Sequence, residues 1–331
     1  MQAAYITAPG APEVITCGDV PRPVPKGNEV LVKIAATAVN PIDTYIRSGL
    51  IPMNLPQPYI VGCDLAGTVE ETGSMAMRFS RGDRVWGSNQ GLMGRQGTCA
   101  EYACVNEDWL YYIPDNVGFE QAAAGALTGI TAHLGLFRCA RLQGGETVYV
   151  SGGTGGVGQM VVQMAKAANA RVITTVGTPE KGNLCRKWGA DLVLLYKTED
   201  IVRAIEDFTQ GEGIHVWYET QREPDFTRII PLMARRGRIL VMAGRQAMPP
   251  FPVGPFYTKD LTLHGFAMFN ASMEEQRSCA EDMNYWYALN WLQPQIGRSF
   301  RLSETVLAHR LQEENTLQKA GTLTGKIVVI P

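Results

Sequence analysis

The stretch from Val148 to Gly158 reads VYVSGGTGGVG and decides the fold of the second half of the chain. A short β-branched run precedes a glycine-rich turn, and the apolar sequence QMVV that follows is typical of the start of a helix. Gly153, Gly155 and Gly158 give the spacing GxGxxG at a strand-to-helix turn, where it predicts a dinucleotide site. We expect Gly153 to permit the tight turn, Gly155 to let the backbone approach a diphosphate, and Gly158 to let helix and strand pack closely.

An anion at this turn would lie on the N-terminus of the helix, where unpaired N–H groups and the helix dipole favour negative charge. The residues expected to contact the dinucleotide here are Gly153, Thr154, Gly155, Gly156, Val157 and Gly158.

Strands and helices alternate around this turn, a pattern that predicts βαβ units and a parallel sheet. The candidate strands are Thr147–Val150, Arg171–Val176, Leu192–Tyr196, His215–Tyr218, Arg238–Met242 and Leu261–Gly265. The candidate helices are Val157–Ala168, Pro179–Trp188, Asp200–Phe208 and Phe226–Ala234, after a helical segment from Glu120 to Leu136. Six strands with crossovers predict an α/β fold with a doubly wound Rossmann sheet.

The end of the second strand indicates which dinucleotide is bound. An NAD site usually places an acidic side chain there, against the ribose 2′-hydroxyl. Gly177 has no carboxylate to repel a 2′-phosphate, Thr178 offers a hydroxyl, and Lys181 offers a cation. These residues favour NADPH. Glu180 argues against NADPH, because a small backbone shift would make it the acidic group of an NAD site.

The first third of the chain is rich in Gly and Pro and has short β-branched runs, which predict a β-rich, barrel-like domain. The chain has 331 residues, which is long for one core and fits two domains. A strand-like tail, Lys326–Ile330, has no partner nearby in sequence, and we expect it to return to the first domain.

Composition excludes several classes of function. The formal net charge is −2 and no run of Lys or Arg suggests a phosphate-backbone groove, so nucleic acid is not an expected partner. No stretch is long and apolar enough to cross a bilayer, and the N-terminus lacks a signal-like pattern, so we expect no membrane partner and a cytoplasmic protein. The seven cysteines are scattered with no CxxC pair, which favours reduced thiols.

Several motifs spread over nearly the whole chain resemble the zeta-crystallin and quinone oxidoreductase branch of the medium-chain dehydrogenases and reductases. The residues that carry the resemblance are Val39–Gly49, Gly62–Gly67, Gly82–Val85, Gln121–Ala124, Leu127–Ala132, Gly153–Gly158 and Thr324–Val328. The resemblance implies a GroES-like catalytic domain formed by residues 1–121 and 296–331, with a Rossmann NADPH-binding domain, residues 122–295, inserted between them.

The resemblance also predicts that no zinc is bound. Zinc-dependent relatives place a Cys before a Ser-Asp pair where this chain has Asn40 to Asp43, and a His-Glu pair where it has Cys63 and Asp64. The four-cysteine lobe of those relatives is missing as well, so the usual tetrahedral ligand set is absent. A Lewis acid eases alcohol oxidation by stabilising an alkoxide, so a reaction without it is expected to deliver hydride to an acceptor that is already electrophilic.

The resemblance further implies roles for individual residues. Asn40 and Thr131 would lie beside the nicotinamide and orient it. Tyr45 would donate a hydrogen bond or a proton to the acceptor, or would simply pack in the barrel. Asp43 is expected to cap the turn that begins at Asn40. The remaining candidates near the cofactor are Tyr196 at the adenosine ribose and its phosphate, Gly244 and Arg245 after the fifth strand, and Lys326 as a weaker candidate than Lys181 for the 2′-phosphate, or a solvated tail lysine.

The function that these observations favour is NADPH-dependent reduction of a quinone or other conjugated carbonyl compound. Two alternatives stay open: an enoyl-thioester or enone reductase, and a non-catalytic NADPH-binding or structural protein. Members of the family pair by joining their Rossmann sheets edge to edge, so a homodimer through Leu261–Gly265 is expected, with a tetramer as the alternative.

Overall fold

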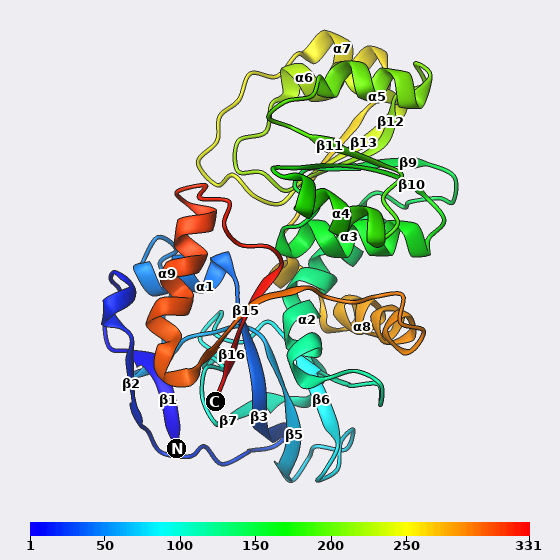
Figure 1. Ribbon diagram of the computed structural model, residues 1–331. Helices are drawn as coiled ribbons and strands as arrows, with labels where there is room; N and C mark the ends of the chain where they lie inside the picture. The colour runs from blue at the N-terminus through cyan, green and yellow to red at the C-terminus, as the bar shows by residue number, and fades with distance from the viewer. The chain divides into compact units, whose positions relative to one another are not determined.

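The computed structural model describes every residue from Met1 to Pro331. The chain divides into two compact units, which Figure 1 shows. The first unit contains Met1–Leu127 and Ser272–Pro331, and the second contains Thr128–Ala271. Both ends of the chain therefore build the first unit, as the resemblance implies for a domain that is split in sequence.

The predicted domain boundaries differ from these units, most of all at residues 272–295. Helix α8 (Met273–Ala288) packs on the first unit and not in the Rossmann domain, where we expected it. Arg277 donates a hydrogen bond to Asp108 at 2.8 Å, and Asn284 donates one to the carbonyl of Tyr112 at 2.9 Å. Helical periodicity alone does not reveal which sheet a helix covers, so the prediction assigned this helix to the wrong domain.

The second unit is built on a six-stranded parallel sheet in the order β11-β10-β9-β12-β13-β14. Its strands are β9 (Thr147–Val150), β10 (Arg171–Val176), β11 (Leu192–Leu195), β12 (Ile214–Glu219), β13 (Met233–Val241) and β14 (Thr262–Gly265). The order reverses between β9 and β12, which is the doubly wound arrangement predicted from the sequence. The predicted bounds of β9 and β10 coincide with those observed.

Helices cover both faces of this sheet, with α3 and α4 on one side and α5, α6 and α7 on the other (Figure 1). The helices are α3 (Gly156–Ala167), α4 (Pro179–Lys187), α5 (Ile201–Thr209), α6 (Phe226–Leu232) and α7 (Val253–Thr258), with a 3-10 turn η4 (Met268–Asn270). A core of aliphatic and aromatic side chains, centred on the fully buried Trp217, lies beneath α5 and α6. Burial of this apolar surface is the main stabilisation of the unit.

The first unit is β-rich, as predicted. Its strands are β1 (Gln2–Ile6), β2 (Thr16–Asp19), β3 (Glu29–Val39), β4 (Tyr59–Ile60), β5 (Leu65–Thr72), β6 (Arg84–Gly87), β7 (Tyr102–Asn106), β8 (Leu110–Tyr112), β15 (Ile296–Arg301) and β16 (Lys326–Ile330). Its other helices are α1 (Pro41–Ser48), α9 (Thr305–Thr316) and the 3-10 turns η1 (Pro12–Val14), η2 (Glu107–Trp109) and η5 (Leu302–Glu304). Helix α2 (Phe119–His133) continues as a π-helical segment η3 (Leu134–Cys139) and carries the chain from the first unit into the second.

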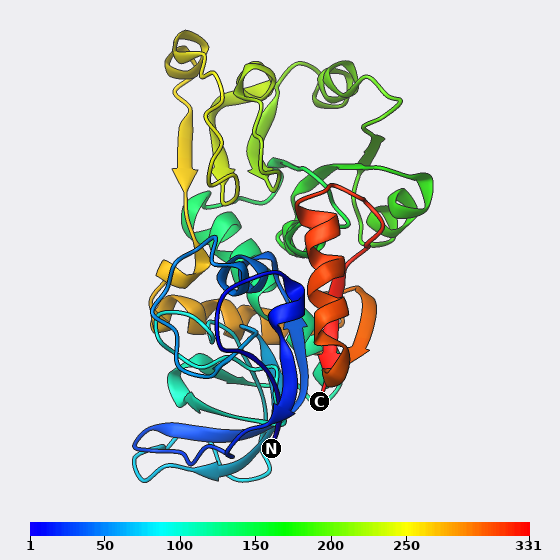
Figure 2. The ribbon, with the colours of Figure 1, turned by 90° about the vertical axis from the view of Figure 1, so that its left-hand side faces the viewer.

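The C-terminal strand returns to the first unit, as the sequence predicts. Strand β16 pairs antiparallel with β3, with Ile327 opposite Val39 and Val329 opposite Thr37. Strand β15 pairs parallel with β16 on its other side. Figure 2 shows the red C-terminal segment beside the blue N-terminal strands, and the two termini lie close together. The tail therefore completes this sheet of the first unit.

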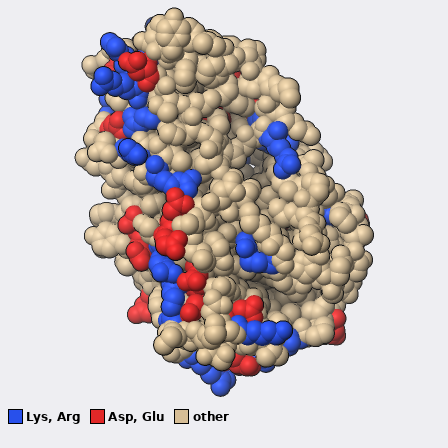
Figure 3. Space-filling view, turned by 180° about the vertical axis from the view of Figure 1, so that it is seen from behind, with Lys and Arg blue, Asp and Glu red and all other residues tan.

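The surface charge is mixed. The chain has 30 Lys and Arg against 32 Asp and Glu. On the face drawn in Figure 3, blue and red residues lie in intermixed groups and most of the face carries neither. No helix has the length and hydropathy needed to span a bilayer.

His309 on α9 is fully buried, and neither of its ring nitrogens has a hydrogen-bond partner. Burial, together with the nearby charge of Arg47, lowers the pKa of His309 from 6.5 to about 3. The folded protein therefore keeps this imidazole neutral over a pH range in which the unfolded chain binds a proton.

We expect the folded state to lose stability steadily as the pH falls from 6.5 towards 3, because in that range only the unfolded chain binds a proton on His309. Replacement of His309 by Leu removes this contribution, so the variant should lose less stability than the wild type between pH 7 and pH 5. Urea unfolding at both pH values measures the difference. Equal losses in both proteins would show that His309 does not bind a proton on unfolding.

Candidate functional site

The glycine turn after β9 keeps the predicted strand-turn-helix geometry, but the residue that makes the turn is not the one expected. Gly152 has φ +67°, a left-handed conformation that favours glycine, whereas Gly153 does not. A Cβ at Gly153 would lie 2.3 Å from the hydroxyl oxygen of Thr174 on β10. Gly153 is thus required for close packing on the neighbouring strand, and Gly152 permits the tight turn.

A Cβ at Gly158 would lie 2.2 Å from the carbonyl oxygen of Gly152, so glycine there lets α3 pack closely against the turn that follows β9. Helix α3 begins at Gly156, and its N-cap Gly155 has no side chain with which to cap the helix. The first N–H groups of α3 are thus left to bond an anion or water. This end of α3 has the chemistry required to hold a diphosphate.

The ends of β10 and β11 meet beside this turn. Val176 pairs with Leu195, so the residues that follow them, Gly177 and Tyr196, lie next to each other. A Cβ at Gly177 would lie 3.1 Å from the Tyr196 hydroxyl, and Tyr196 is exposed. The sequence named both residues as candidates, and the structure brings them together.

Lys181 lies in the first turn of α4, and a second lysine, Lys197, lies close to it. Burial and then the positive charge of Lys197 lower the pKa of Lys181. Two ammonium groups near each other repel, and a phosphate dianion would relieve that repulsion. Lys197 is not among the residues predicted from the sequence, although a lysine directly after the candidate Tyr196 is a signal that could have identified it.

Thr178 and Glu180 lie at the N-terminus of α4, Thr178 as its N-cap and Glu180 in its first turn. The Thr178 hydroxyl oxygen accepts a hydrogen bond from the N–H of Lys181. Hydrogen bonds from its own backbone and from Thr178 lower the pKa of Glu180. The Glu180 carboxylate is exposed in the first turn of α4, where the helix dipole favours negative charge.

Gly244 and Arg245 follow β13 at the same edge of the sheet as the glycine turn. Gly244 has φ +87°, and a Cβ there would lie 2.4 Å from the carbonyl oxygen of Arg222. Arg245 is exposed. Their contact with a cofactor stays a prediction.

Thr131 lies on α2, and its carbonyl oxygen accepts a hydrogen bond from the hydroxyl of Tyr218 at 2.7 Å. Tyr218 is on β12 and pairs with Val150 at the end of β9, so Thr131 is tied to the strand beside the glycine turn. His133 on the same helix is buried, and its ring lies 4.6 Å from that of Phe137.

In the first unit, Asn40 is the N-cap of α1, and Asp43 forms a capping box with it, as predicted. The side chain of Asn40 is fully buried. Its Nδ2 donates to Asp64 Oδ2 at 2.7 Å and, more weakly, to the carbonyl of Ala38 at 3.4 Å. Both hydrogens of the Asn40 amide are therefore used inside the first unit. Tyr45 lies on α1 and is half-buried.

Lys326 is neither a phosphate ligand nor a solvated lysine, which corrects both expectations for it. The residue is 3% exposed, and its Nζ donates to the carbonyl of Val39 at 2.7 Å and to Asn40 Oδ1 at 2.5 Å. Pairing of β16 with β3 carries this lysine into the interior of the first unit. A lysine whose ammonium is bonded inside that unit is not available to a 2′-phosphate.

The segments that match zinc-ligand positions in other relatives form a hydrogen-bonded cluster in this chain. Asp64 accepts hydrogen bonds from Ser88 Oγ at 2.6 Å and from the N–H of Leu127 at 3.2 Å, in addition to that from Asn40. Cys63 is buried, and burial raises the pKa of its thiol well above the ordinary value. No group of three or more His, Cys, Asp or Glu side chains is arranged to hold a metal ion.

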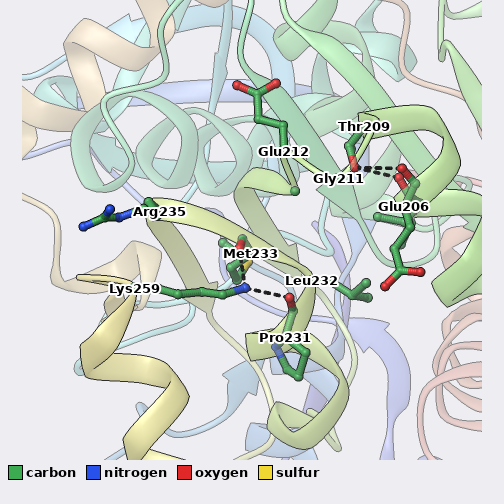
Figure 4. A pocket seen from close by; sticks show the side chains of 11 residues that line it. Glu206, Thr209, Gly211, Glu212, Pro231, Leu232, Met233, Arg235 and Lys259 are labelled. Carbon is green, nitrogen blue, oxygen red and sulfur yellow. Dashed lines mark hydrogen bonds between the residues drawn. The ribbon is translucent and has the colours of Figure 1, made fainter.

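A separate pocket of about 450 Å³ lies in the second unit, at the amino ends of β12 and β13 (Figure 4). Lys259 lies at this pocket and donates to the carbonyls of Pro231 at 2.7 Å and Met233 at 2.8 Å. The strands are parallel, so the pocket is at the opposite edge of the sheet from the glycine turn. It has no part in the candidate dinucleotide site.

Comparison with known proteins matches both units. The family described as "Alcohol dehydrogenase GroES-like domain" matches residues 26–115, and the family described as "Zinc-binding dehydrogenase" matches residues 156–283. A quinone oxidoreductase from Sus scrofa is 33% identical over 333 aligned residues, covering 100% of this chain and 98% of that protein.

Two solved structures similar to this chain contain NADPH. The Escherichia coli quinone oxidoreductase in complex with NADPH has a TM-score of 0.86 at 27% identity and covers 100% of both chains. A mycobacterial protein in complex with NADPH has a TM-score of 0.86 at 30% identity, again with 100% of both chains covered.

Replacement of Gly158 by Ala should destabilise the second unit by about 1 to 3 kcal/mol, because the new Cβ would meet backbone atoms of Gly152 that have no room to move. Binding of NADPH should weaken as well, since the turn would have to open. Calorimetry and NADPH titration measure the two effects. Gly254→Ala on α7 is the matched control, because nothing lies within 4 Å of a Cβ there. Wild-type stability of Gly158→Ala would contradict the close packing described for the turn.

Proposed function

Because the chain belongs to the quinone oxidoreductase family of the medium-chain dehydrogenases and reductases, we propose that it is an NADPH-dependent quinone reductase that works without zinc. The observation that carries the cofactor choice is the pair Lys181 and Lys197 beside Gly177, at the edge where the glycine turn exposes the N-terminus of α3. Together they offer a helix end for a diphosphate and two cations for a 2′-phosphate.

The bound nicotinamide would supply a hydride to the electrophilic ring of the acceptor. The chain's own residues hold and orient the reactants, which is the protein's main contribution when a cofactor carries the chemistry. Gly153 to Gly158 would bind the diphosphate, and Thr131 and Asn40 would lie beside the nicotinamide and orient it. Tyr45 would donate a hydrogen bond to the acceptor oxygen as negative charge develops on it.

Independence from zinc is supported by the groups at the positions that match zinc ligands in other relatives. Asn40 supplies an amide and Cys63 a thiol whose pKa is raised. The ammonium of the buried Lys326 bonds Asn40. A thiol must lose its proton to bind zinc, and the Lys326 ammonium would repel a cation at this place. The residues present therefore do not suit a divalent metal.

We further propose a cytoplasmic homodimer. Strand β14 is an edge of the Rossmann sheet, and Thr262 and Leu263 on it are exposed, which leaves backbone groups for a second copy of the chain. Seven free cysteines suit a reducing compartment.

The proposed reaction is tested by following NADPH consumption with a naphthoquinone, a benzoquinone, an enone and an enoyl thioester, with NADH in parallel. We expect turnover of the quinones, preference for NADPH, and unchanged rates after treatment with a metal chelator. Turnover of the thioester alone would replace this function with enoyl reduction, and loss of activity on chelation would contradict the absence of zinc.

Replacement of Lys181 or Lys197 by Ala should raise the KM for NADPH about tenfold each, since a hydrogen bond to a charged group contributes about 1.5 to 3 kcal/mol. The KM for NADH should change little, because NADH has no 2′-phosphate. Lys187→Ala at the exposed end of α4 is the control. Equal effects on both cofactors would place these lysines elsewhere than at the 2′-phosphate.

A further inference from the structure

Lys326 enters the interior of the first unit at the start of β16. Gly325, immediately before it, has φ +84°, and a Cβ at that position would lie 2.2 Å from the carbonyl oxygen of Gln295. The N–H of Lys326 donates to the same carbonyl at 2.8 Å. The backbone at the entry of the lysine is therefore closely fixed, and so is the direction in which its side chain leaves β16.

The ammonium of Lys326 bonds the corner at which β3 ends and α1 begins. It donates to the carbonyl of Val39, the last residue of β3, and to the side-chain oxygen of Asn40, the N-cap of α1. The N–H of Asn40 in turn donates to Asp43 Oδ2 at 2.7 Å, inside the first turn of the helix. Hydrogen bonds thus hold the last residue of β3, the N-cap of α1 and the first turn of α1.

These bonds also fix the orientation of the Asn40 amide. Its oxygen faces Lys326 and its nitrogen faces Asp64, so rotation of the amide by a half turn would set donor against donor at Lys326 and would remove the bond that Asn40 donates to Asp64 Oδ2. A buried polar group that loses its partner costs about 1 to 3 kcal/mol, which strongly disfavours the rotated state. Lys326 and Asp64 therefore hold the amide from opposite sides.

We propose that Lys326 is a positioning residue of the reductase: through Val39 and Asn40 it fixes the corner from which α1 projects, and thereby the place of Tyr45 on that helix. This inference rests on the proposed function, because Tyr45 is assigned to the acceptor there. Lys326 itself touches neither the 2′-phosphate nor the acceptor. The C-terminal strand thus has a role in catalysis that is separate from its role in completing the sheet.

A purely structural role is the competing explanation, in which Lys326 only offsets the buried charge of Asp64. A pair of variants distinguishes the positioning role from the purely structural role. Lys326→Met removes the ammonium and leaves Asp64 as an uncompensated buried acid, whereas Lys326→Met with Asp64→Asn removes both charges. The second variant should regain stability without regaining the bonds to Val39 and Asn40. Lys33→Met, on the exposed side of β3, is the matched control.

Four measurements on the full-length variants test the proposal: the melting temperature, kcat and KM with NADPH and a benzoquinone, the affinity for 2′,5′-ADP, and hydrogen exchange of residues 40–48. We expect the double variant to melt near the wild type, yet to have a kcat about tenfold below that of Asp64→Asn alone, or 1.4 kcal/mol in activation free energy. Its affinity for 2′,5′-ADP should be unchanged, and the α1 amides should exchange faster than in Lys33→Met.

Recovery of kcat together with the melting temperature would overturn the proposal and leave Lys326 a charge-balancing residue. Loss of affinity for 2′,5′-ADP would return Lys326 to the phosphate site and overturn it as well. If the wild type does not reduce quinones, the proposed function fails, and hydrogen exchange of α1 alone decides whether Lys326 fixes the corner. Unchanged exchange in both variants would contradict that role.

Discussion

The candidate cofactor site depends on the close approach of Gly158, in the first turn of α3, to the carbonyl of Gly152. A Cβ at Gly158 would lie 2.2 Å from that oxygen, so only glycine lets α3 begin so close to the end of β9. The close approach leaves the N-terminus of α3 without a side-chain cap at the carboxyl edge of the sheet. The neighbouring strand β10 adds Gly177, which leaves room beside Tyr196.

A second constraint acts in the first unit, where the two ends of the chain meet. Strand β16 adds to β3, and Lys326 crosses to the corner that begins α1. Burial lowers the pKa of Lys326 and raises that of Asp64, and each charge partly offsets the effect of burial on the other. Buried polar groups of this kind stabilise one arrangement only when their hydrogen bonds are satisfied together. The catalytic unit therefore depends on a residue that lies near the very end of the sequence.

Much of the fold could be predicted from the sequence because its signals are local. The parallel strands are largely apolar runs between helices, and Gly153 to Gly158 mark the turn proposed to bind the dinucleotide. Long-range pairing decides the rest. Whether Lys326 is solvated depends on the strand beside it, and the approach of Lys197 to Lys181 depends on the register of β10 with β11. The predicted domain of α8 was wrong for the same reason, since the helical periodicity of its sequence does not reveal which sheet the helix packs on.

A crystal structure of the protein with NADPH tests the central claim most directly. We predict the diphosphate on the N–H groups at the start of α3 and the 2′-phosphate between Lys181 and Lys197, beside Tyr196. A diphosphate bound away from Gly153 to Gly158, or a 2′-phosphate held by Lys326, would contradict the account.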